Sequence, residues 1–334
     1  MKFGCSLEMV NMRVSEPGFK HKLSKSYWVE LLKFIATSGF KGIELPYNTY
    51  STDGIAFNMA RSGMPISKYA INTKYGSVNE FKNLLNHVGI EEVTGVHLNA
   101  SDALIELLTT GQHPDKLFEK VEAAADEAID FLLEIGGKEL VISPTPEIGL
   151  LNQIMGHKND DWPQAFLSQT ADVINRIGTK AAANRIQASI RNEFWSLIRG
   201  NQLDFFMDKL DPQNLKYSPD LAHLHISGVD PKEVVEKYKD RISSIRFSDT
   251  KFEDLENNFS KTNPEFPVVG VQRVFCDLGD GHIDIKGIYQ ILLGTGYDGW
   301  IICESKKTLN VYKALLKLDW YINNSLKITG EECK

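Results

Sequence analysis

Eight short apolar runs recur along the chain, and segments with helical periodicity separate most of them. The runs are Lys2–Leu7, Gly42–Leu45, Val93–Leu98, Glu139–Ser143, Ile186–Arg191, Leu215–Ser218, Ser244–Phe247 and Trp300–Cys303. The predicted helices include Tyr27–Thr37, Val78–Val88, Asp115–Ile135, Gln164–Asn184 and Pro231–Lys239. Alternation of strand and helix requires parallel strands joined by right-handed crossovers. Eight such units predict an α/β protein with a single (β/α)₈ TIM barrel.

Three connections are long for simple loops: Tyr47–Gly76, Pro144–Pro163 and Asp249–Asp280. Each follows a predicted strand, so a barrel places all three on its C-terminal face. Long loops there commonly act as lids over a site, and an oligomer interface is the alternative. No low-complexity segment divides the 334 residues, so we expect one domain over 1–334.

The charge pattern argues against nucleic-acid and membrane partners. The net charge is −7, and the Lys and Arg residues are scattered among acidic ones. Phosphate binding needs clustered cations. The four cysteines form no CxxC pair, as expected of reduced thiols. No apolar stretch approaches 18 residues, so a cytoplasmic location is expected.

Ionisable residues concentrate at the ends of the predicted strands. They are Glu44, His97, Arg191, Glu193, Asp220, His223, Arg246, Asp249 and Glu304. In a barrel, the residues at the carboxyl ends of the strands face one shared cup. Charged groups are seldom buried unless they are paired or bind a metal, so their concentration predicts a site there.

Several segments resemble the xylose isomerase-like TIM barrel superfamily, which includes sugar phosphate isomerases and epimerases, inosose dehydratase and the AP endonuclease family 2-like proteins. The most specific are "GDGHIDIKGIYQILLGTGYDGWIICES" and "SPDLAHLHISGVDP", and "ATSGFKGIEL" is similar to the family's second strand. The resemblance implies a divalent metal (Mn, Mg, Co or Zn) held by strand-end carboxylates. Asp220 and Glu304 fall on metal-ligand positions, and His223 falls on a substrate-contacting histidine.

Two positions depart from the family pattern, because Arg246 and Arg191 stand where a metal-binding His and Glu are usual. An arginine has no lone pair to offer a metal. Glu193 can restore a three-carboxylate site with Asp220 and Glu304, and this is the predicted metal set. His97 or His223 can complete the coordination instead. In the third alternative the metal is lost, and the two arginines bind an anionic or carbonyl group of the substrate.

The expected chemistry is removal of a proton next to a carbonyl through a stabilised enediolate. It needs a base and groups that stabilise the developing oxyanion. We expect Glu193, Glu304 and His97 to be catalytic. The predicted substrate-binding residues are Arg191, His223, Arg246, Trp195 and Glu44. The last two come from the rim aromatics and from the second strand.

These residues predict a carbohydrate isomerase or epimerase that acts on a small sugar or sugar derivative. The alternatives are a dehydratase or lyase acting on a keto-sugar, keto-inositol or keto-glycoside, and a catalytically altered barrel with a binding role. An endonuclease-like function is disfavoured, because the chain is acidic and has few histidines at the rim. Assembly into a homo-oligomer is compatible with the sequence.

Overall fold

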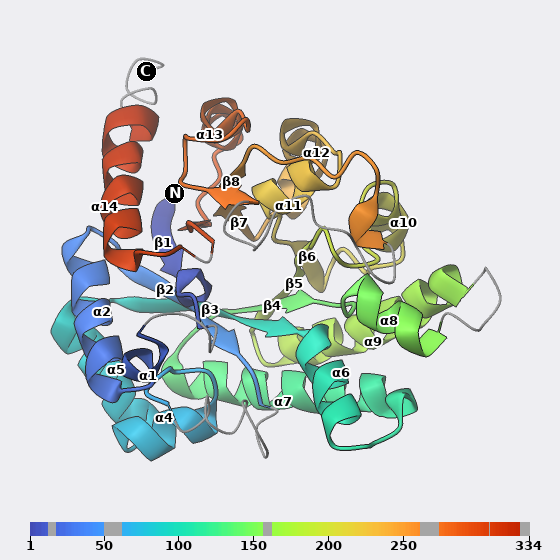
Figure 1. Cartoon of the computed structure of the whole chain (residues 1–334), viewed down its shortest axis with the longest axis horizontal. Coiled ribbons are helices and arrows are strands. Elements are labelled where there is room, and N and C mark those ends of the chain that lie inside the picture. Colours follow the sequence, from blue (N-terminus) through green and yellow to red (C-terminus); the bar gives the residue numbers. More distant parts are fainter. Residues whose placement is uncertain (13–17, 50–61, 156–161, 261–273, 307, 328–334) are drawn as a thin grey trace.

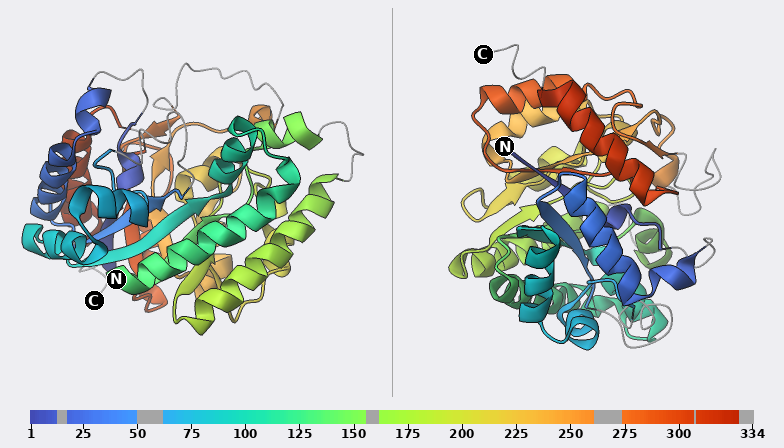
Figure 2. Two further views of the ribbon diagram at one scale, coloured as in Figure 1. Left: turned by 90° about the horizontal axis from the view of Figure 1, so that it is seen from below. Right: turned by 90° about the vertical axis from the view of Figure 1, so that its left-hand side faces the viewer.

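The computed structural model describes residues 1–12, 18–49, 62–155, 162–260, 274–306 and 308–327. Eight parallel strands form its central sheet, and helices surround the sheet (Figures 1 and 2). The strands are β1 (Lys2–Ser6), β2 (Gly42–Tyr47), β3 (Glu92–Asn99), β4 (Glu139–Ser143), β5 (Gln187–Ile190), β6 (Leu215–Tyr217), β7 (Ser244–Phe247) and β10 (Trp300–Cys303). The eight predicted strands are thereby confirmed, with ends that differ by no more than a few residues.

The sheet curls into a nearly closed barrel with the strand order β6-β5-β4-β3-β2-β1-β10-β7. The seam lies between β6 and β7. There the amide of Ser243 donates to the carbonyl of Tyr217 (3.1 Å), and the amide of Arg246 donates to that of Pro219 (2.8 Å). The predicted (β/α)₈ barrel is confirmed.

Thirteen α-helices lie in the described residues. They are α1 (Phe19–Lys22), α2 (Lys25–Thr37), α4 (Lys68–Tyr75), α5 (Val78–Val88), α6 (Ala100–Thr109), α7 (Leu117–Ile135), α8 (Ile148–Met155), α9 (Trp162–Ala183), α10 (Gln202–Asp208), α11 (Leu221–Ile226), α12 (Pro231–Tyr238), α13 (Ile285–Gly294) and α14 (Val311–Tyr321). Within the part of the chain described, none is long and apolar enough to cross a membrane.

Helix α7 illustrates why these segments pack as they do. Its residues Val121, Ala124, Ile129 and Leu132 recur at helical spacing and are buried. One apolar stripe can therefore cover the sheet while the other face meets solvent. The helix ends at Gly136, whose φ of 86° lies in the left-handed region that glycine adopts most easily.

The three long connections, which are too long for simple loops, contain regular elements. The first contains α4 and the second contains α8. The third contributes β8 (Asp249–Thr250) and β9 (Phe275–Cys276), an antiparallel pair beyond the barrel. A predicted role as lids falls largely on residues 50–61, 156–161 and 261–273, which lie outside the described residues.

Candidate active site

A cavity of about 130 Å³ lies at the carboxyl ends of the strands. Its lining residues are Glu8, Asn99, Arg191, Glu193, Trp195, His223, Phe275, Glu304 and Lys306. Larger cavities exist near the amino end of β1 (about 480 Å³) and among α6, α7, α8 and α9 (about 520 Å³). Active sites of parallel barrels form at the carboxyl ends of the strands, so the small cavity is the candidate active site.

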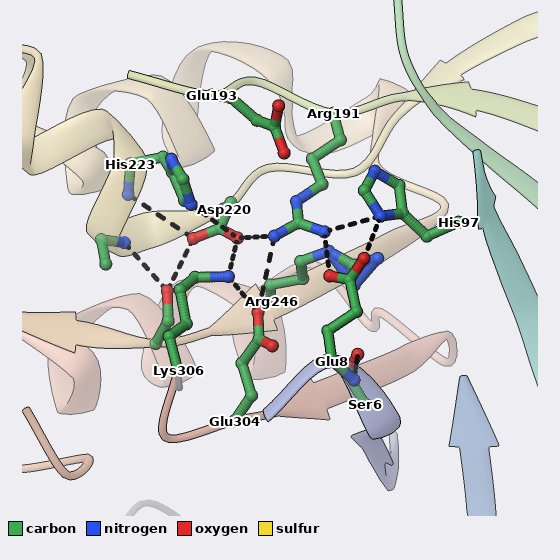
Figure 3. Close-up of polar contacts among 12 residues, drawn as sticks. Ser6, Glu8, His97, Arg191, Glu193, Asp220, His223, Arg246, Glu304 and Lys306 are labelled. Atoms are coloured by element: carbon green, nitrogen blue, oxygen red, sulfur yellow. Dashed lines mark hydrogen bonds and ion pairs between the residues drawn. The ribbon is translucent and has the colours of Figure 1, made fainter. Parts of the chain in front are cut away.

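Arg191 is at the centre of this site, directly after β5 (Figure 3). Its Nη1 lies 2.8 Å from Oε2 of Glu8, and its Nη2 lies 2.9 Å from Oδ2 of Asp220. Nη2 also lies 3.7 Å from Oε1 of Glu304. Burial opposes the charge, but Glu8, Asp220 and Glu304 hold the pKa of Arg191 well above its ordinary value. The guanidinium therefore joins acidic residues that follow three different strands.

Lys306 brings a second cation into the same cluster. Its Nζ lies 2.8 Å from Oδ2 of Asp220 and contacts Oε1 of Glu304. The ammonium also lies 5.7 Å from the centre of the Phe275 ring. The lysine side chain is only 7% exposed. Sequence analysis missed Lys306, because a lysine in a "KK" pair after a strand is typical of a solvent-exposed residue.

Asp220 is fully buried and is held by several donors. Besides the two cations, the hydroxyl of Ser248 donates to its Oδ1 (2.6 Å). Burial alone would raise the pKa of this carboxyl, but Lys306, His223 and Arg191 hold it well below the ordinary value. Asp220 is therefore a fixed carboxylate that positions its neighbours.

Glu8 and His97 form a second, partly buried contact on the other side of Arg191 (Figure 3). Glu8 lies in the 3₁₀ turn Leu7–Met9 after β1, and its Oε1 is 2.5 Å from Nδ1 of His97. Burial lowers the pKa of His97 to about 4, so the ring is neutral at pH 7. A neutral ring that donates from Nδ1 to Glu8 accepts at Nε2 from the hydroxyl of Ser143 (2.8 Å). Sequence analysis missed Glu8, although it directly follows the predicted strand Lys2–Leu7.

Glu193 presents a different kind of carboxylate to the cavity. Its donors are the neutral groups Nδ2 of Asn99 (3.2 Å) and Nε1 of Trp195 (2.8 Å). Burial raises the pKa of Glu193, and Arg191 opposes that rise. A buried carboxyl with a raised pKa is suited to proton transfer near neutral pH. Trp195 also lines the cavity, and its indole nitrogen orients this acid.

His223 faces the cavity from α11, the short helix after Asp220. The amide of Phe194 donates to its Nδ1 (3.1 Å), and burial keeps the pKa of the ring well below its ordinary value. The proton of the neutral ring is therefore on Nε2, which lies 3.9 Å from Oδ2 of Asp220. Nε2 has no hydrogen-bond partner in the described residues, so it can donate to a bound molecule.

Glu44 and Arg246 lie deeper in the barrel than the other predicted site residues. Arg246 pairs across the sheet with Ile302, two positions before Glu304, and ion-pairs with Glu44. Both are buried, and neither is among the residues that line the cavity. Burial raises the pKa of Glu44 to about 7, and Arg246 opposes that rise. Their contact with substrate stays a prediction. Their position below the cavity does not favour it.

The three predicted metal ligands do not form a metal site. Lys306 and Arg191 contact Oδ2 of Asp220 and lie near Oε1 of Glu304, whereas Glu193 accepts hydrogen bonds from Asn99 and Trp195. Within the described residues, no three His, Cys, Asp or Glu side chains are grouped to hold a metal ion. Because cations already neutralise these carboxylates, the donor set does not fit a divalent metal.

A nearly closed parallel barrel with acids and cations at its carboxyl ends defines a TIM-barrel protein with an enzyme-like site. The sequence profile of the family "Xylose isomerase-like TIM barrel" matches residues 32–321. The chain belongs to this family, as its sequence motifs predict.

Among curated proteins, the chain is similar to inosose dehydratases. It is 28% identical to that of Lacticaseibacillus casei over 239 residues, which cover 70% of this chain and 78% of the relative. It is also 28% identical to the inosose dehydratase of Geobacillus thermodenitrificans, over 63% of this chain and 72% of the relative. These relatives are named as enzymes that act on sugar derivatives.

Solved structures with the same fold include both dehydratases and epimerases. The probable 3-DHS dehydratase AsbF of Bacillus anthracis has a TM-score of 0.66 at 15% identity and covers 97% of this chain and 100% of its own. D-allulose 3-epimerase of Methylomonas sp. in complex with D-allulose has a TM-score of 0.62 at 14% identity, with coverages of 97% and 96%. IOLI protein with a binding zinc atom has a TM-score of 0.62 at 12% identity, with coverages of 99% and 97%. At these identities the likeness shows the shared fold alone.

Proposed function

We propose that this chain is a lyase that removes water from a keto-inositol or a related keto-sugar. The observation that carries the proposal is that Glu193, a buried carboxyl with a raised pKa, shares a cavity with the cationic Arg191. Such a pair suits proton removal next to a carbonyl. The inosose dehydratase relatives favour the lyase alternative over the isomerase or epimerase reading, because an inosose is a keto-inositol.

In the proposed reaction, the Glu193 carboxylate takes a proton from the carbon next to the carbonyl. The C–H electrons form the enolate double bond, and the carbonyl oxygen takes up the negative charge. Arg191 stabilises this charge. The enolate then reforms the carbonyl, a carbon–carbon double bond forms, and the C–O bond at the β-carbon breaks. The leaving hydroxide takes the proton from Glu193, so one water is released and the carboxylate is restored.

Epimerisation or isomerisation is the second candidate, and Glu304 supports it. Its Oε2 is buried, lines the same cavity as Glu193 and has no hydrogen-bond partner in the described residues. A second carboxylate can return a proton to another face or another carbon of the enolate. His97 is a positioning residue in either reaction, since its ring is held between Glu8 and Ser143.

The test is incubation with a keto-inositol and, separately, with a ketohexose in D₂O. Mass spectrometry should detect loss of one water from the keto-inositol and little deuterium exchange into unreacted ketohexose. We expect Glu193→Gln to lower kcat by at least about 100-fold, because it removes the base. Glu91→Gln, at an exposed position by the amino ends of the strands, is the matched control. Deuterium exchange into ketohexose without any dehydration would favour the epimerase instead.

A cytoplasmic location and assembly into a homo-oligomer remain predictions. Light scattering of the purified protein tests the assembly, and cell fractionation tests the location.

A further inference from the structure

We propose that Lys306, together with Arg191, binds the carbonyl oxygen of the substrate where a divalent metal would otherwise act, so that the reaction needs no metal. This inference rests on the proposed keto-sugar lyase and assigns its electrophile. It starts from the finding that cations contact Asp220 and Glu304, two of the three residues predicted to bind a metal. Neither the family resemblance nor the sequence pattern points to Lys306.

The first support is the position of the ammonium group. Lys306 follows Glu304 by two residues, and its Nζ reaches back to contact both Glu304 and Asp220 (Figure 3). These are the two carboxylates that the resemblance assigns to a metal. The ammonium therefore lies between the predicted ligands, and Phe275 flanks it at 5.7 Å.

The second support is that two cations already contact these acids. Lys306 and Arg191 bring two positive charges to Asp220 and Glu304 within contacts of 3.7 Å or less, and Arg191 also pairs with Glu8. A divalent ion between these carboxylates would meet both cations at short range. It would have to displace Lys306 from a buried site before binding.

The third support is the free donor capacity toward the cavity. An ammonium has three N–H donors, and Asp220 and Glu304 account for two of them. Nε of Arg191 is also buried and has no hydrogen-bond partner in the described residues. Both side chains line the cavity that holds Glu193. A carbonyl oxygen bound there would meet preorganised cationic donors while Glu193 removes the neighbouring proton.

The metal half of the inference is tested without substrate. Protein dialysed against EDTA is titrated with Mn²⁺ and with Zn²⁺ by calorimetry, and its metal content is measured before dialysis. We expect substoichiometric metal and no binding tighter than about millimolar at the site. Stoichiometric metal that EDTA removes, or micromolar binding that Asp220→Asn abolishes, would overturn the inference. This result stands even if no keto-sugar is turned over, so it separates failure of the inference from failure of the proposed function.

The lysine half is tested by turnover of a keto-inositol. We expect wild-type kcat to stay within about twofold after EDTA treatment. Lys306→Met should lower kcat by at least about 100-fold with a smaller change in KM, and Lys306→Arg should recover part of the loss. Lys313→Met, on the exposed face of α14, is the matched control, and thermal melting checks that each variant is folded. Full activity in Lys306→Met, or activity that EDTA abolishes and Mn²⁺ restores, would overturn the inference.

Discussion

Arg191 connects more acidic side chains than its place at the end of a strand indicates. It contacts Glu8, Asp220 and Glu304, and all of these contacts are buried or nearly so. A buried ion pair gains little over well-packed apolar groups, but removing one partner leaves the other charge exposed to a low dielectric. The loss of stability on replacing Arg191 therefore comes from the buried acidic side chains that are left without a partner.

We expect Arg191→Met to destabilise the protein by about 3–5 kcal/mol, because Asp220 and Glu8 would lose a buried partner. Urea unfolding measures the change. Arg176→Met is the control, since Arg176 pairs with Glu122 at the surface with its side chain 58% exposed, and its loss should cost about 1 kcal/mol or less. Equal effects of the two substitutions would show that the central cluster contributes no more than a surface pair.

His97 should make the free energy of unfolding depend on pH between the pKa of its ring in the unfolded chain and the pKa in the folded protein. The unfolded chain takes up a proton as pH falls below about 6.5, whereas the folded protein keeps the ring neutral until about 4. The unfolded state binds more protons in this window, so stability falls as the pH falls. The full lowering of the His97 pKa corresponds to about 3 kcal/mol in the free energy of unfolding.

Urea unfolding at several pH values between 7.5 and 4 measures this contribution. As the pH falls from 7.5 to 4, the free energy of unfolding of the wild type should decrease by up to about 3 kcal/mol more than that of His97→Gln. His113→Gln, at an exposed position, should retain the wild-type slope. Parallel pH profiles for wild type and His97→Gln would refute the assignment.

At the scale of elements, helix starts follow local sequence rules. Ser24 and Ser77 directly precede α2 and α5 and cap them. The hydroxyl of Ser24 accepts from the amide of Tyr27 (3.2 Å), and that of Ser77 accepts from the amide of Glu80 (3.1 Å). These contacts involve residues three apart in the chain, so local sequence can predict them.

We expect Ser77→Ala to destabilise the protein by about 1 kcal/mol, because the first turn of α5 loses its side-chain acceptor. Thermal or urea unfolding measures the loss. Ser168→Ala, at a half-buried position inside α9, removes no cap and should change stability by about 0.5 kcal/mol or less. A similar loss in both variants would mean that capping is not the cause.

At the scale of the whole molecule, closure of the barrel links the first and last parts of the chain. β1 pairs with β10 on one side and with β2 on the other. The buried apolar side chains form one connected core, whose members range along the chain from Cys5 to Leu326. Unfolding of either half would break the strand pairs at its edges and expose part of this shared core.

The predicted single domain therefore has a calorimetric test. We expect one unfolding transition, with a ratio of calorimetric to van't Hoff enthalpy of about 1. Weakening the contact between β6 and β7 at the seam should lower the midpoint temperature of this single transition without splitting it in two. Two resolved transitions would contradict the expectation of one domain over residues 1–334.

The sequence by itself predicts the fold well, because alternating strands and helices are encoded by local hydrophobic periodicity. It also identifies Arg191, Glu193, Asp220, His223 and Glu304 as neighbours, since each follows a strand that ends at the same face of the barrel. Helices within the long connections were missed, because their periodic segments are only eight residues long.

The tertiary structure alone decides how the charges at the rim pair. Glu8 and Lys306 join the site from the turns after β1 and β10, and Arg246 ion-pairs with Glu44. The choice between a metal and an ammonium between Asp220 and Glu304 depends on distances of about 3 Å across the barrel. Residue types and their order decide which side chains reach the rim, but electrostatic pairing among residues up to 202 positions apart in the chain is settled only when the barrel closes.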